Sequence, residues 1–312
     1  MTPFFSVIIP LYNKEAYIYA TITSALNQSF ANFEIIIIND GSTDGSLNKV
    51  QSIQDKRISI FTIKNQGVSY ARNYGIKKAS SNFIALIDAD DIWYKNHLEE
   101  LHKSILKFPN ADLFCNRYEV LLSEGIKKNG IYNIPKSGSI IVVKDFFKAS
   151  LISSIARISA SAFNKKTFFD IKMFNSLYRS GQDTDLWIRF GLNKKIVFNP
   201  KITSCYNNIV EQSLSKRNYN VDRYNIIKSY TNVENNHKSL KHYLDINRYA
   251  IAIRCKMNNE NELYKTLKKE IDYSNLNNKQ KILLRLPKFL LMFIKRCQYF
   301  LIKKEIYLTS YT

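Results

Sequence analysis

Three carboxylates follow directly after a short apolar segment in the first third of the chain. Asp88, Asp90 and Asp91 come after residues 83–87, whose length and composition are typical of a parallel strand buried on both faces. Because an unpaired carboxylate is costly to desolvate, we expect these acids at the carboxyl end of the strand, where open α/β sheets bind ligands. Clustered carboxylate oxygens suit Mg²⁺ or Mn²⁺, so one interpretation of the pattern is a divalent-metal site. The alternative is a solvated acidic turn that caps the helix expected near Trp93.

The segments around this acidic turn alternate between strand and helix patterns. Val/Ile-rich strands are predicted at residues 5–9, 33–38, 57–63 and 83–87, and helices at 15–27, from about 44, and at 68–79. This alternation with short connections indicates an α/β fold with a mostly parallel, doubly wound sheet and helices on both faces. The strand ends then place Tyr12, Asp40 and the pair Asp88 and Asp90 along one edge of the sheet, which is the ligand crevice of this architecture.

The rest of the chain continues this pattern and becomes helical from about residue 220. After a helix that runs from Trp93 to about Phe108, further strands are predicted at 111–118, 158–163 and 195–206, and further helices at 143–151 and 183–192. Residues 119–142 show weak alternation and are interpreted as a β-excursion or an acceptor loop.

Composition excludes several classes of protein. The four cysteines are far apart, and the four histidines show no HExxH spacing, which argues against a zinc module or a secreted disulfide framework and suits a reducing cytosol. Residues 1–100 hold nine Lys or Arg against ten Asp or Glu, whereas the remaining residues hold 37 basic and 16 acidic side chains. Only the second part is therefore built to meet an anion, and no recognisable nucleic-acid module accompanies the charge.

Five short motifs resemble those of the inverting glycosyltransferases of family 2, which share the GT-A fold. Each motif is weak alone, but together, in family order and spacing over roughly residues 4–215, they make a strong signal. They are Ser-Val-Ile-Ile-Pro-Leu-Tyr-Asn (6–13), Ile-Ile-Asn-Asp-Gly-Ser-Thr-Asp (37–44), Asn-Gln-Gly (65–67) with Ala-Arg-Asn-x-Gly (71–75), Asp-Ala-Asp-Asp (88–91), and Gly-Gln-Asp-x-Asp-Leu-Trp (181–187).

The resemblance implies a role for each matching residue. The base of a nucleotide would lie against Pro10 and Tyr12, and Asp40 would accept a hydrogen bond from it. The sugar-phosphate part would lie near Arg72 and Asp88. The full set of expected substrate-binding residues is Pro10, Tyr12, Asn13, Asp40, Arg72, Asp88 and Trp187. Without the family order, Asp40 could equally cap the following helix and Arg72 could pair with any acid.

The resemblance also implies the metal and the base. Asp90, with Asp88, would hold Mn²⁺ or Mg²⁺ against the donor's diphosphate, whose charge a metal neutralises without a protonated acid. Asp183 matches the general base that takes the proton of the acceptor hydroxyl. The alternative is that Asp183 only caps a helix, and Trp187, on the same helical face, is more often a core residue than an acceptor platform.

Two departures from the family pattern concern this region. Gln182 stands where the family usually has Glu, so one carboxylate remains at the base position. The stretch 206–213 contains no His where many members carry Arg-x-His after the last core strand, which leaves the metal's outer coordination open.

The C-terminal stretch 279–304 is strongly basic, with eight Lys or Arg and no Asp or Glu. Six of the eight fall on one helical face opposite Leu and Phe, and Pro287 is expected to divide the stretch into two helices. The basic side chains on that face are Lys281, Arg285, Lys288, Lys295, Arg296 and Lys303. This pattern is typical of a helix that lies on an anionic membrane surface, and the alternative is a helix packed on the catalytic domain.

These observations predict an inverting enzyme that transfers a sugar from a nucleotide diphosphate donor, expected to be UDP-linked, to a glycan or lipid-linked glycan acceptor of surface polysaccharide. A GT-A domain is expected at 1–218, with a nucleotide-sugar half at 1–110 and an acceptor half at 111–218, and a basic helical region at 219–312. The N-terminus does not read as a signal peptide and no apolar run could span a bilayer, so we expect a cytoplasmic protein on the inner membrane face. The alternative is a non-catalytic basic protein that binds an anionic polymer or membrane and keeps a vestigial nucleotide crevice.

Overall fold

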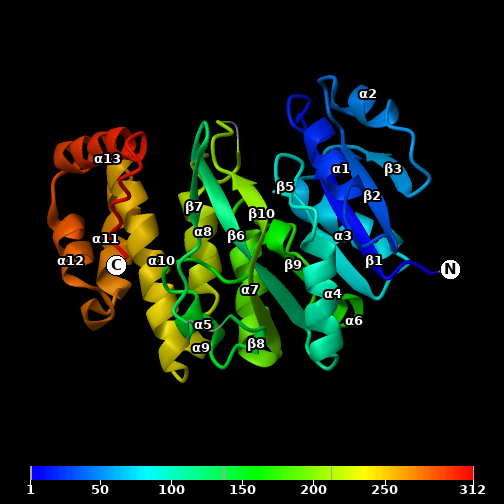
Figure 1. Cartoon of the computed structure of the whole chain (residues 1–312). Coiled ribbons are helices and arrows are strands. Elements are labelled where there is room, and N and C mark those ends of the chain that lie inside the picture. Colours follow the sequence, from blue (N-terminus) through cyan, green and yellow to red (C-terminus); the bar gives the residue numbers. More distant parts are fainter. Residues whose placement is uncertain (1, 136–137, 212, 312) are drawn as a thin grey trace.

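The computed structural model of the chain describes residues 2–135, 138–211 and 213–311. Its first part is a run of parallel strands joined by helices (Figure 1). The strands are β1 (Phe5–Leu11), β2 (Phe33–Asp40), β3 (Ile58–Ile63) and β4 (Phe83–Leu86), and the helices are α1 (Ile18–Leu26), α2 (Ser46–Gln51) and α3 (Val68–Lys78). The pairs β1–β2, β1–β4 and β2–β3 are all parallel. The predicted strands and their shared edge are therefore confirmed.

The second part extends the same sheet, whose order is β3-β2-β1-β4-β9-β6-β10-β5. Its strands are β5 (Ile92–Trp93), β6 (Leu113–Ser123), β7 (Ile126–Asn129), β8 (Ile141–Val142), β9 (Ser161–Asn164) and β10 (Ile196–Asn207). Its helices are α4 (His97–Lys107), α5 (Phe146–Ala149), η1 (Ile158–Ala160), α6 (Lys165–Asp170) and α7 (Gln182–Asn193). Because β9 runs antiparallel between β4 and β6, it joins the four parallel strands of the first part to the parallel pair β6–β10. The strands β5, β7 and β8 pair antiparallel with that pair.

Three predicted elements differ in detail from the structure. Residues 92–93 form a short strand against β10, so the helix expected from Trp93 begins at His97. The helix predicted at 143–151 is the shorter α5, and the strand predicted at 158–163 begins as the 3₁₀ turn η1. For residues 92–93, pairing with the distant strand β10 overrides the locally favoured helix.

Alternation along the central strands divides the core into two clusters. Ile8, Ile36 and Leu86 face one cluster together with Ala71 and Ile76 of α3. The neighbouring positions Val7, Ile9, Ile35 and Ile37 face the other cluster, which α1 and α4 cover. A strand whose residues are apolar at every position is therefore buried on both faces, as its sequence predicts.

The elements that the structure describes after β10 are helices, and they pack on one side of the sheet domain (Figure 1). They are α8 (Asn220–Lys228), α9 (Thr231–Glu234), α10 (Lys238–Met257), α11 (Asn261–Glu270), η2 (Tyr273–Asn275), α12 (Asn278–Arg285) and α13 (Lys288–Ile302). Tyr243, Leu244 and Leu284 belong to the same core cluster as Phe146 and Trp187 of the sheet domain. The division of the basic tail at Pro287 is confirmed.

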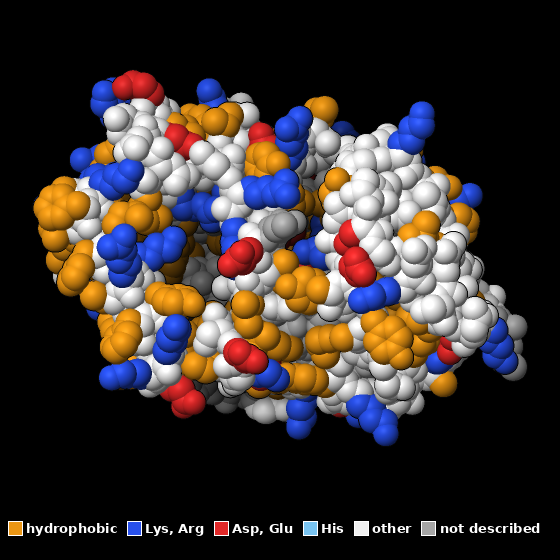
Figure 2. All heavy atoms as spheres, turned by 90° about the horizontal axis from the view of Figure 1, so that it is seen from above, with side chains coloured by type: hydrophobic (Ala, Val, Ile, Leu, Met, Phe, Trp, Pro, Cys, Tyr) orange, Lys and Arg blue, Asp and Glu red, His pale blue; other side chains and the backbone are white. Residues whose placement is uncertain are grey.

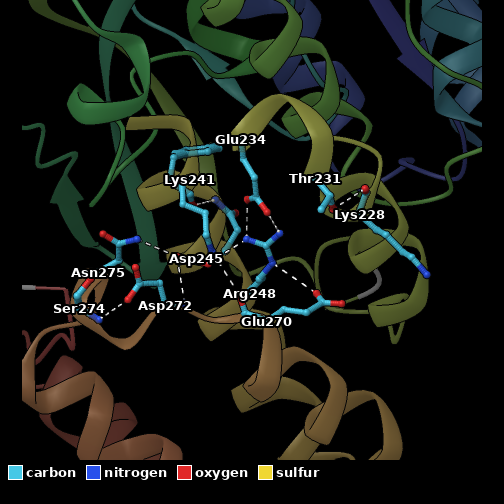
Figure 3. Close-up of polar contacts among 12 residues, drawn as sticks. Lys228, Thr231, Glu234, Lys241, Asp245, Arg248, Glu270, Asp272, Ser274 and Asn275 are labelled. Carbon is cyan, nitrogen blue, oxygen red and sulfur yellow. Dashed lines mark hydrogen bonds and ion pairs between the residues drawn. The ribbon is translucent and has the colours of Figure 1, made fainter. Parts of the chain in front are cut away.

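A buried arginine connects the C-terminal helices to one another (Figure 3). The guanidinium of Arg248 on α10 lies 2.7 Å from Glu234 Oε1 of α9 and 2.9 Å from Asp245 Oδ1. A third carboxylate, Glu270 of α11, lies 3.5 Å from Arg248 Nε. Removing one partner of such a buried network costs roughly 3–5 kcal/mol, so these contacts fix how the helices pack. Within the described ranges, no helix combines the length and the apolar character needed to pass through a bilayer.

Candidate functional site

The acidic turn after β4 lies at the predicted edge of the sheet, and two of its three carboxylates pair with cations of the protein. Arg72 Nη2, on α3, lies 2.6 Å from Asp88 Oδ1. Lys14 Nζ, just after β1, lies 2.5 Å from Asp90 Oδ2. Burial raises the pKa of Asp90, as does the charge of Asp88, and Lys14 opposes the rise. The turn is thus a partly buried site in which negative charge is matched by positive charge.

The third carboxylate of the turn is structural. Asp91 is buried and accepts hydrogen bonds from the hydroxyl of Ser159 and from the backbone amide of Asn207 at 2.8 Å. Burial, together with the charges of Asp90 and Asp88, raises the pKa of Asp91 to about 8. Ser159 Oγ also accepts a hydrogen bond from the amide of Asp88 at 3.0 Å. Asp91 therefore fastens the acidic turn to η1 and to the end of β10.

The carboxylate oxygens of Asp88 and Asp90 suit a metal ion whose other ligands are waters and substrate phosphates. In the part of the chain that the structure describes, no three His, Cys, Asp or Glu side chains are grouped as a complete metal cage. Mg²⁺ is usually held by one or two carboxylates, together with waters and substrate phosphates. Asp88 and Asp90 fit that kind of site, because each is partly exposed and uses one oxygen for its ion pair.

The ends of β1 and β2 are fastened together by Asn13. Its Oδ1 accepts a hydrogen bond from the amide of Thr43 at 2.8 Å, and its Nδ2 donates to Thr43 Oγ1 at 3.2 Å. Asn13 itself has a positive φ of 49°. Its side chain thus joins the loops that follow β1 and β2. Tyr12 beside it is 45% exposed, and Pro10 is buried in β1.

Asp40 at the end of β2 fixes the loop that leads into α3. Its two carboxylate oxygens accept hydrogen bonds from the amides of Gln66 at 2.8 Å and Gly67 at 2.9 Å. Burial raises the pKa of Asp40, and these two amides oppose the rise. Asp40 holds the start of α3 and does not cap the helix that directly follows it. A hydrogen bond to a base would use a second lone pair of one of these oxygens.

Arg72 combines burial with unused donors. It is 4% exposed, lies over the ring of Phe174 with its guanidinium carbon 5.2 Å from the centroid, and bonds Asp88 through one nitrogen. Its Nε and Nη1 are buried without a hydrogen-bond partner among the described residues. Unpaired buried donors are costly, so an acceptor atom of a ligand would be favoured there. This agrees with a position near ribose or phosphate.

Asp183 lies in the first turn of α7, and its carboxylate has no cationic partner within ion-pair distance in the described ranges. Its Oδ1 accepts a hydrogen bond from the amide of Thr184 at 2.8 Å. The preceding Gly181 has a φ of 86°, which favours glycine, and a Cβ there would also lie 3.0 Å from Ile226. This tight turn places Asp183 in the first turn of α7, and its carboxylate is not used in an ion pair with a described residue.

The neighbours of Asp183 on α7 are used for packing. Asp185 is buried, pairs with Arg189 at 2.6 Å and accepts a hydrogen bond from Tyr230 at 2.7 Å. Trp187 is 2% exposed and packs against Phe190 in the core. Trp187 therefore offers no surface to an acceptor in this conformation, and packing is the role that its surroundings give it.

Arg157 is a site residue that the sequence did not indicate. Its guanidinium carbon lies 3.4 Å from the ring centroid of Tyr206 and 5.3 Å from that of Tyr118. Burial lowers the pKa of Arg157, but the phenols and the charges of Asp91 and Asp183 raise it overall. Arg157 thus lies in the field of both the acidic turn and the start of α7. A single Arg before a short strand belongs to no sequence motif, so the sequence does not show that Arg157 lies at the site.

Comparison with known proteins identifies the family. The sequence profile described as glycosyl transferase family 2 matches residues 6–165, which is just over half of the chain. An uncharacterised glycosyltransferase of Rickettsia bellii is 35% identical over 184 residues, which are 59% of this chain and 26% of that protein. The UDP-Glc:alpha-D-GlcNAc-diphosphoundecaprenol beta-1,3-glucosyltransferase WfgD of Escherichia coli is 39% identical over 122 residues, 39% of this chain and 48% of WfgD. The matches thus span about a quarter to a half of these relatives' own length.

Solved structures confirm the fold. The crystal structure of residues 1–349 of S. aureus TarS in complex with UDP-GlcNAc superposes with a TM-score of 0.67. The superposition covers 88% of this chain and 83% of TarS 1–349, at 19% sequence identity, and the neighbour has the expected GT-A fold. On the match to the family profile, the chain belongs to glycosyl transferase family 2.

Proposed function

We propose that the chain transfers a sugar from a UDP-linked donor to a hydroxyl of a glycan or lipid-linked glycan, with inversion, in the synthesis of a surface polysaccharide. The observation that carries the proposal is a difference among the carboxylates in whether a cation of the protein lies beside them. Asp88 and Asp90 lie beside cations at the strand ends, whereas Asp183 has no cationic partner among the described residues. The first arrangement suits a bound diphosphate, and the second suits a base.

The donor would lie across the ends of β1, β2 and β4. Tyr12 has an exposed ring that a base can cover, and Arg72 has two buried donors free for ribose or phosphate oxygens. Mn²⁺ or Mg²⁺, held by Asp90 and Asp88, would neutralise the charge of the departing diphosphate. The name of WfgD specifies UDP-Glc and the TarS complex holds UDP-GlcNAc, which supports a UDP-linked donor.

Asp183 would accept the proton of the acceptor hydroxyl as that oxygen attacks the sugar. A single displacement from the side opposite the leaving group inverts the anomeric centre. The side chain of Gln182 has no useful proton affinity near neutral pH, and Asp185 is engaged with Arg189 and Tyr230. Asp183 is therefore the carboxylate of this helix that is free to act.

The membrane part of the proposal rests on α13. Large apolar side chains are exposed along it beside Lys295 and Arg296, namely Phe289, Met292, Phe293, Ile294, Tyr299 and Phe300. Seen from above, hydrophobic and basic side chains lie side by side over the C-terminal helices at the left (Figure 2). Such a surface suits the headgroup region of an anionic bilayer, and would place the enzyme on the cytoplasmic face.

One experiment tests the proposal against a non-catalytic protein that only binds an anionic polymer. Nucleotide sugars are incubated with the protein and Mn²⁺, and mass spectrometry follows binding and slow hydrolysis of each donor. We expect hydrolysis of one UDP-sugar by the wild type and none by Asp90→Asn. If no nucleotide sugar is bound or hydrolysed by the folded wild type, the vestigial-crevice alternative is correct.

A further inference from the structure

A pocket of about 220 Å³ opens beside the carboxylate of Asp183. One wall is the turn Ser180–Gly181 at the start of α7, and the other is formed by α8 and α10, which contribute Arg223, Asn247 and Arg254. Figure 2 shows a hollow bordered by Lys and Arg side chains next to the C-terminal helices. The proposed base thus shares one pocket with two arginines from outside the five family motifs.

Neither arginine is neutralised by a carboxylate within ion-pair distance in the described part of the chain. Arg223 Nη2 donates to Ser180 Oγ at 2.8 Å and to the carbonyl of Ser215 at 3.1 Å. Arg254 Nη2 donates to the same carbonyl at 2.8 Å, and its Nε and Nη1 bond no described residue. Burial, together with the charge of Arg254, lowers the pKa of Arg223 to about 10. Both guanidinium groups therefore donate to the same neutral carbonyls, those of Ser215 and Arg217, and Arg223 also reaches the carbonyl of Leu214.

These hydrogen bonds hold the segment around Ser215, but neutral carbonyls do not balance two positive charges, and Nε and Nη1 of Arg254 are not used for them. Guanidinium groups match the oxygens of phosphate in charge and in planar geometry. We propose that this pocket binds a phosphate ester of the acceptor through Arg223 and Arg254, while the acceptor hydroxyl lies at Asp183. The inference rests on the proposed function and specifies the acceptor as an anionic, phosphate-bearing substrate.

The phosphate has two chemical sources, a lipid-linked sugar diphosphate and a phosphodiester within a glycan. The helix that carries Arg254 also packs against α13, the exposed apolar helix. A lipid-linked acceptor anchored beneath α13 would therefore reach the pocket past α10. Geranyl diphosphate and a glycerol phosphate oligomer serve as probes that separate the two sources.

The test is calorimetric titration of α-D-glucose 1-phosphate into the full chain with saturating UDP and Mg²⁺, so that the donor crevice is filled. We expect binding of the phosphate and none of methyl α-D-glucoside, and a loss of at least tenfold in affinity for Arg254→Gln. Arg179→Gln removes an exposed arginine next to the pocket and should change nothing. UDP binding should be the same in all three proteins.

A second variant guards against a folding defect in Arg254→Gln. Ala250→Glu adds a carboxylate to the pocket wall, keeps both arginines and suits a helix, so it should also abolish binding of the probe. Tighter binding of either geranyl diphosphate or the glycerol phosphate oligomer supports the site and identifies the source. If UDP binds but no phosphate probe does, or if Arg254→Gln and Ala250→Glu both bind like Arg179→Gln, the inference is wrong. Absence of UDP binding would instead overturn the proposed function.

Discussion

Lys14 Nζ lies 2.5 Å from Asp90 Oδ2, so the carboxylate expected to hold the metal is already paired with a cation of the chain. The pair joins the end of β1 to the turn after β4, and both side chains are mostly buried. A divalent ion at Asp90 must therefore compete with, or displace, this ammonium group. Under the proposed function, a displaced Lys14 would meet the negative charge of the donor's diphosphate.

Lys14→Met should strengthen Mn²⁺ binding to the nucleotide-free protein. Even an exposed ion pair can contribute about 1 kcal/mol, which corresponds to roughly fivefold in affinity, so removal of this mostly buried competitor should give at least that gain. Calorimetry, or the electron paramagnetic resonance signal of free Mn²⁺, measures the change in affinity. Lys95→Met, which removes an exposed lysine near the turn, is the matched control.

Asp90→Asn should lose metal-dependent UDP binding with the fold intact. Equal UDP affinity for Asp90→Asn and the wild type, with and without Mn²⁺, would remove the metal assignment.

The strands and the order of the crevice residues could be predicted because their signals are local. An apolar run such as residues 33–38 marks a strand, and the polar residues that follow it mark the strand end, so Asp40 and Asp88 were placed on one edge correctly. Parallel pairing of neighbouring strands then follows from the alternation of strands and helices.

The ion pairs and the cation–π contact at the site could not be predicted because they join distant segments. Lys14 and Asp90 are 76 positions apart, and the contact between Arg157 and Tyr206 depends on where η1 meets β10. Single basic residues in loops have no periodic pattern to mark them. The antiparallel insertion of β9 between β4 and β6 was likewise unmarked, because its four residues form a strand only through both neighbours.

His97→Phe should make the protein less sensitive to acid. His97 stacks on Trp93 with ring centroids 4.3 Å apart, and burial lowers its pKa to about 3 from the ordinary value of 6.5. The folded state therefore keeps His97 neutral while the unfolded chain takes up a proton below pH 6.5. Stability should fall by about 1.4 kcal/mol per pH unit from pH 6.5 toward 3 in the wild type relative to the variant.

Denaturant unfolding of both proteins at several pH values measures this difference. Comparing the two proteins cancels groups such as Asp91, whose raised pKa acts in the opposite direction. The loss of the contact between His97 Nδ1 and Thr203 Oγ1, 2.7 Å apart, lowers the stability of the variant by a constant amount. Parallel curves for the two proteins would show that His97 does not resist protonation.

The double substitution Phe289→Ser and Phe293→Ser should release the protein from anionic vesicles. Both rings are more than 60% exposed on α13, and a fully buried Phe contributes about 1.5–3 kcal/mol. We expect at least a ~10-fold loss of binding in flotation assays, and weaker wild-type binding as salt rises. Substitution is a cleaner test than deletion of residues 279–312, because Leu284 on α12 is part of the core.

Leu177→Ser provides the matched control for this surface, since Leu177 is 86% exposed on a loop outside the C-terminal helices. It removes a comparable exposed side chain without touching α13. Wild-type protein that stays off anionic vesicles at low salt would disprove the membrane surface. The double variant exposes less apolar surface than the wild type, so it should stay soluble. Its insolubility would instead indicate that the two rings help α13 to pack on the protein, and would count against the membrane surface.

Asp183→Asn should reduce turnover by roughly 10²–10⁴-fold while UDP and metal binding stay near wild type. The N-cap of α7 is Gly181, without a side-chain cap, and an amide keeps the oxygen that accepts the Thr184 hydrogen bond, so the melting temperature should be nearly unchanged. Asp185→Asn is the contrasting variant, because it weakens the contacts with Arg189 and Tyr230. Its main effect should be a lower melting temperature and not a lower turnover. If Asp183 only capped α7, its loss would cost about 1 kcal/mol of stability and leave turnover largely intact below the melting point. Measuring both quantities on each variant separates the two roles, and a stable Asp183→Asn protein with near-normal turnover would exclude Asp183 as the base.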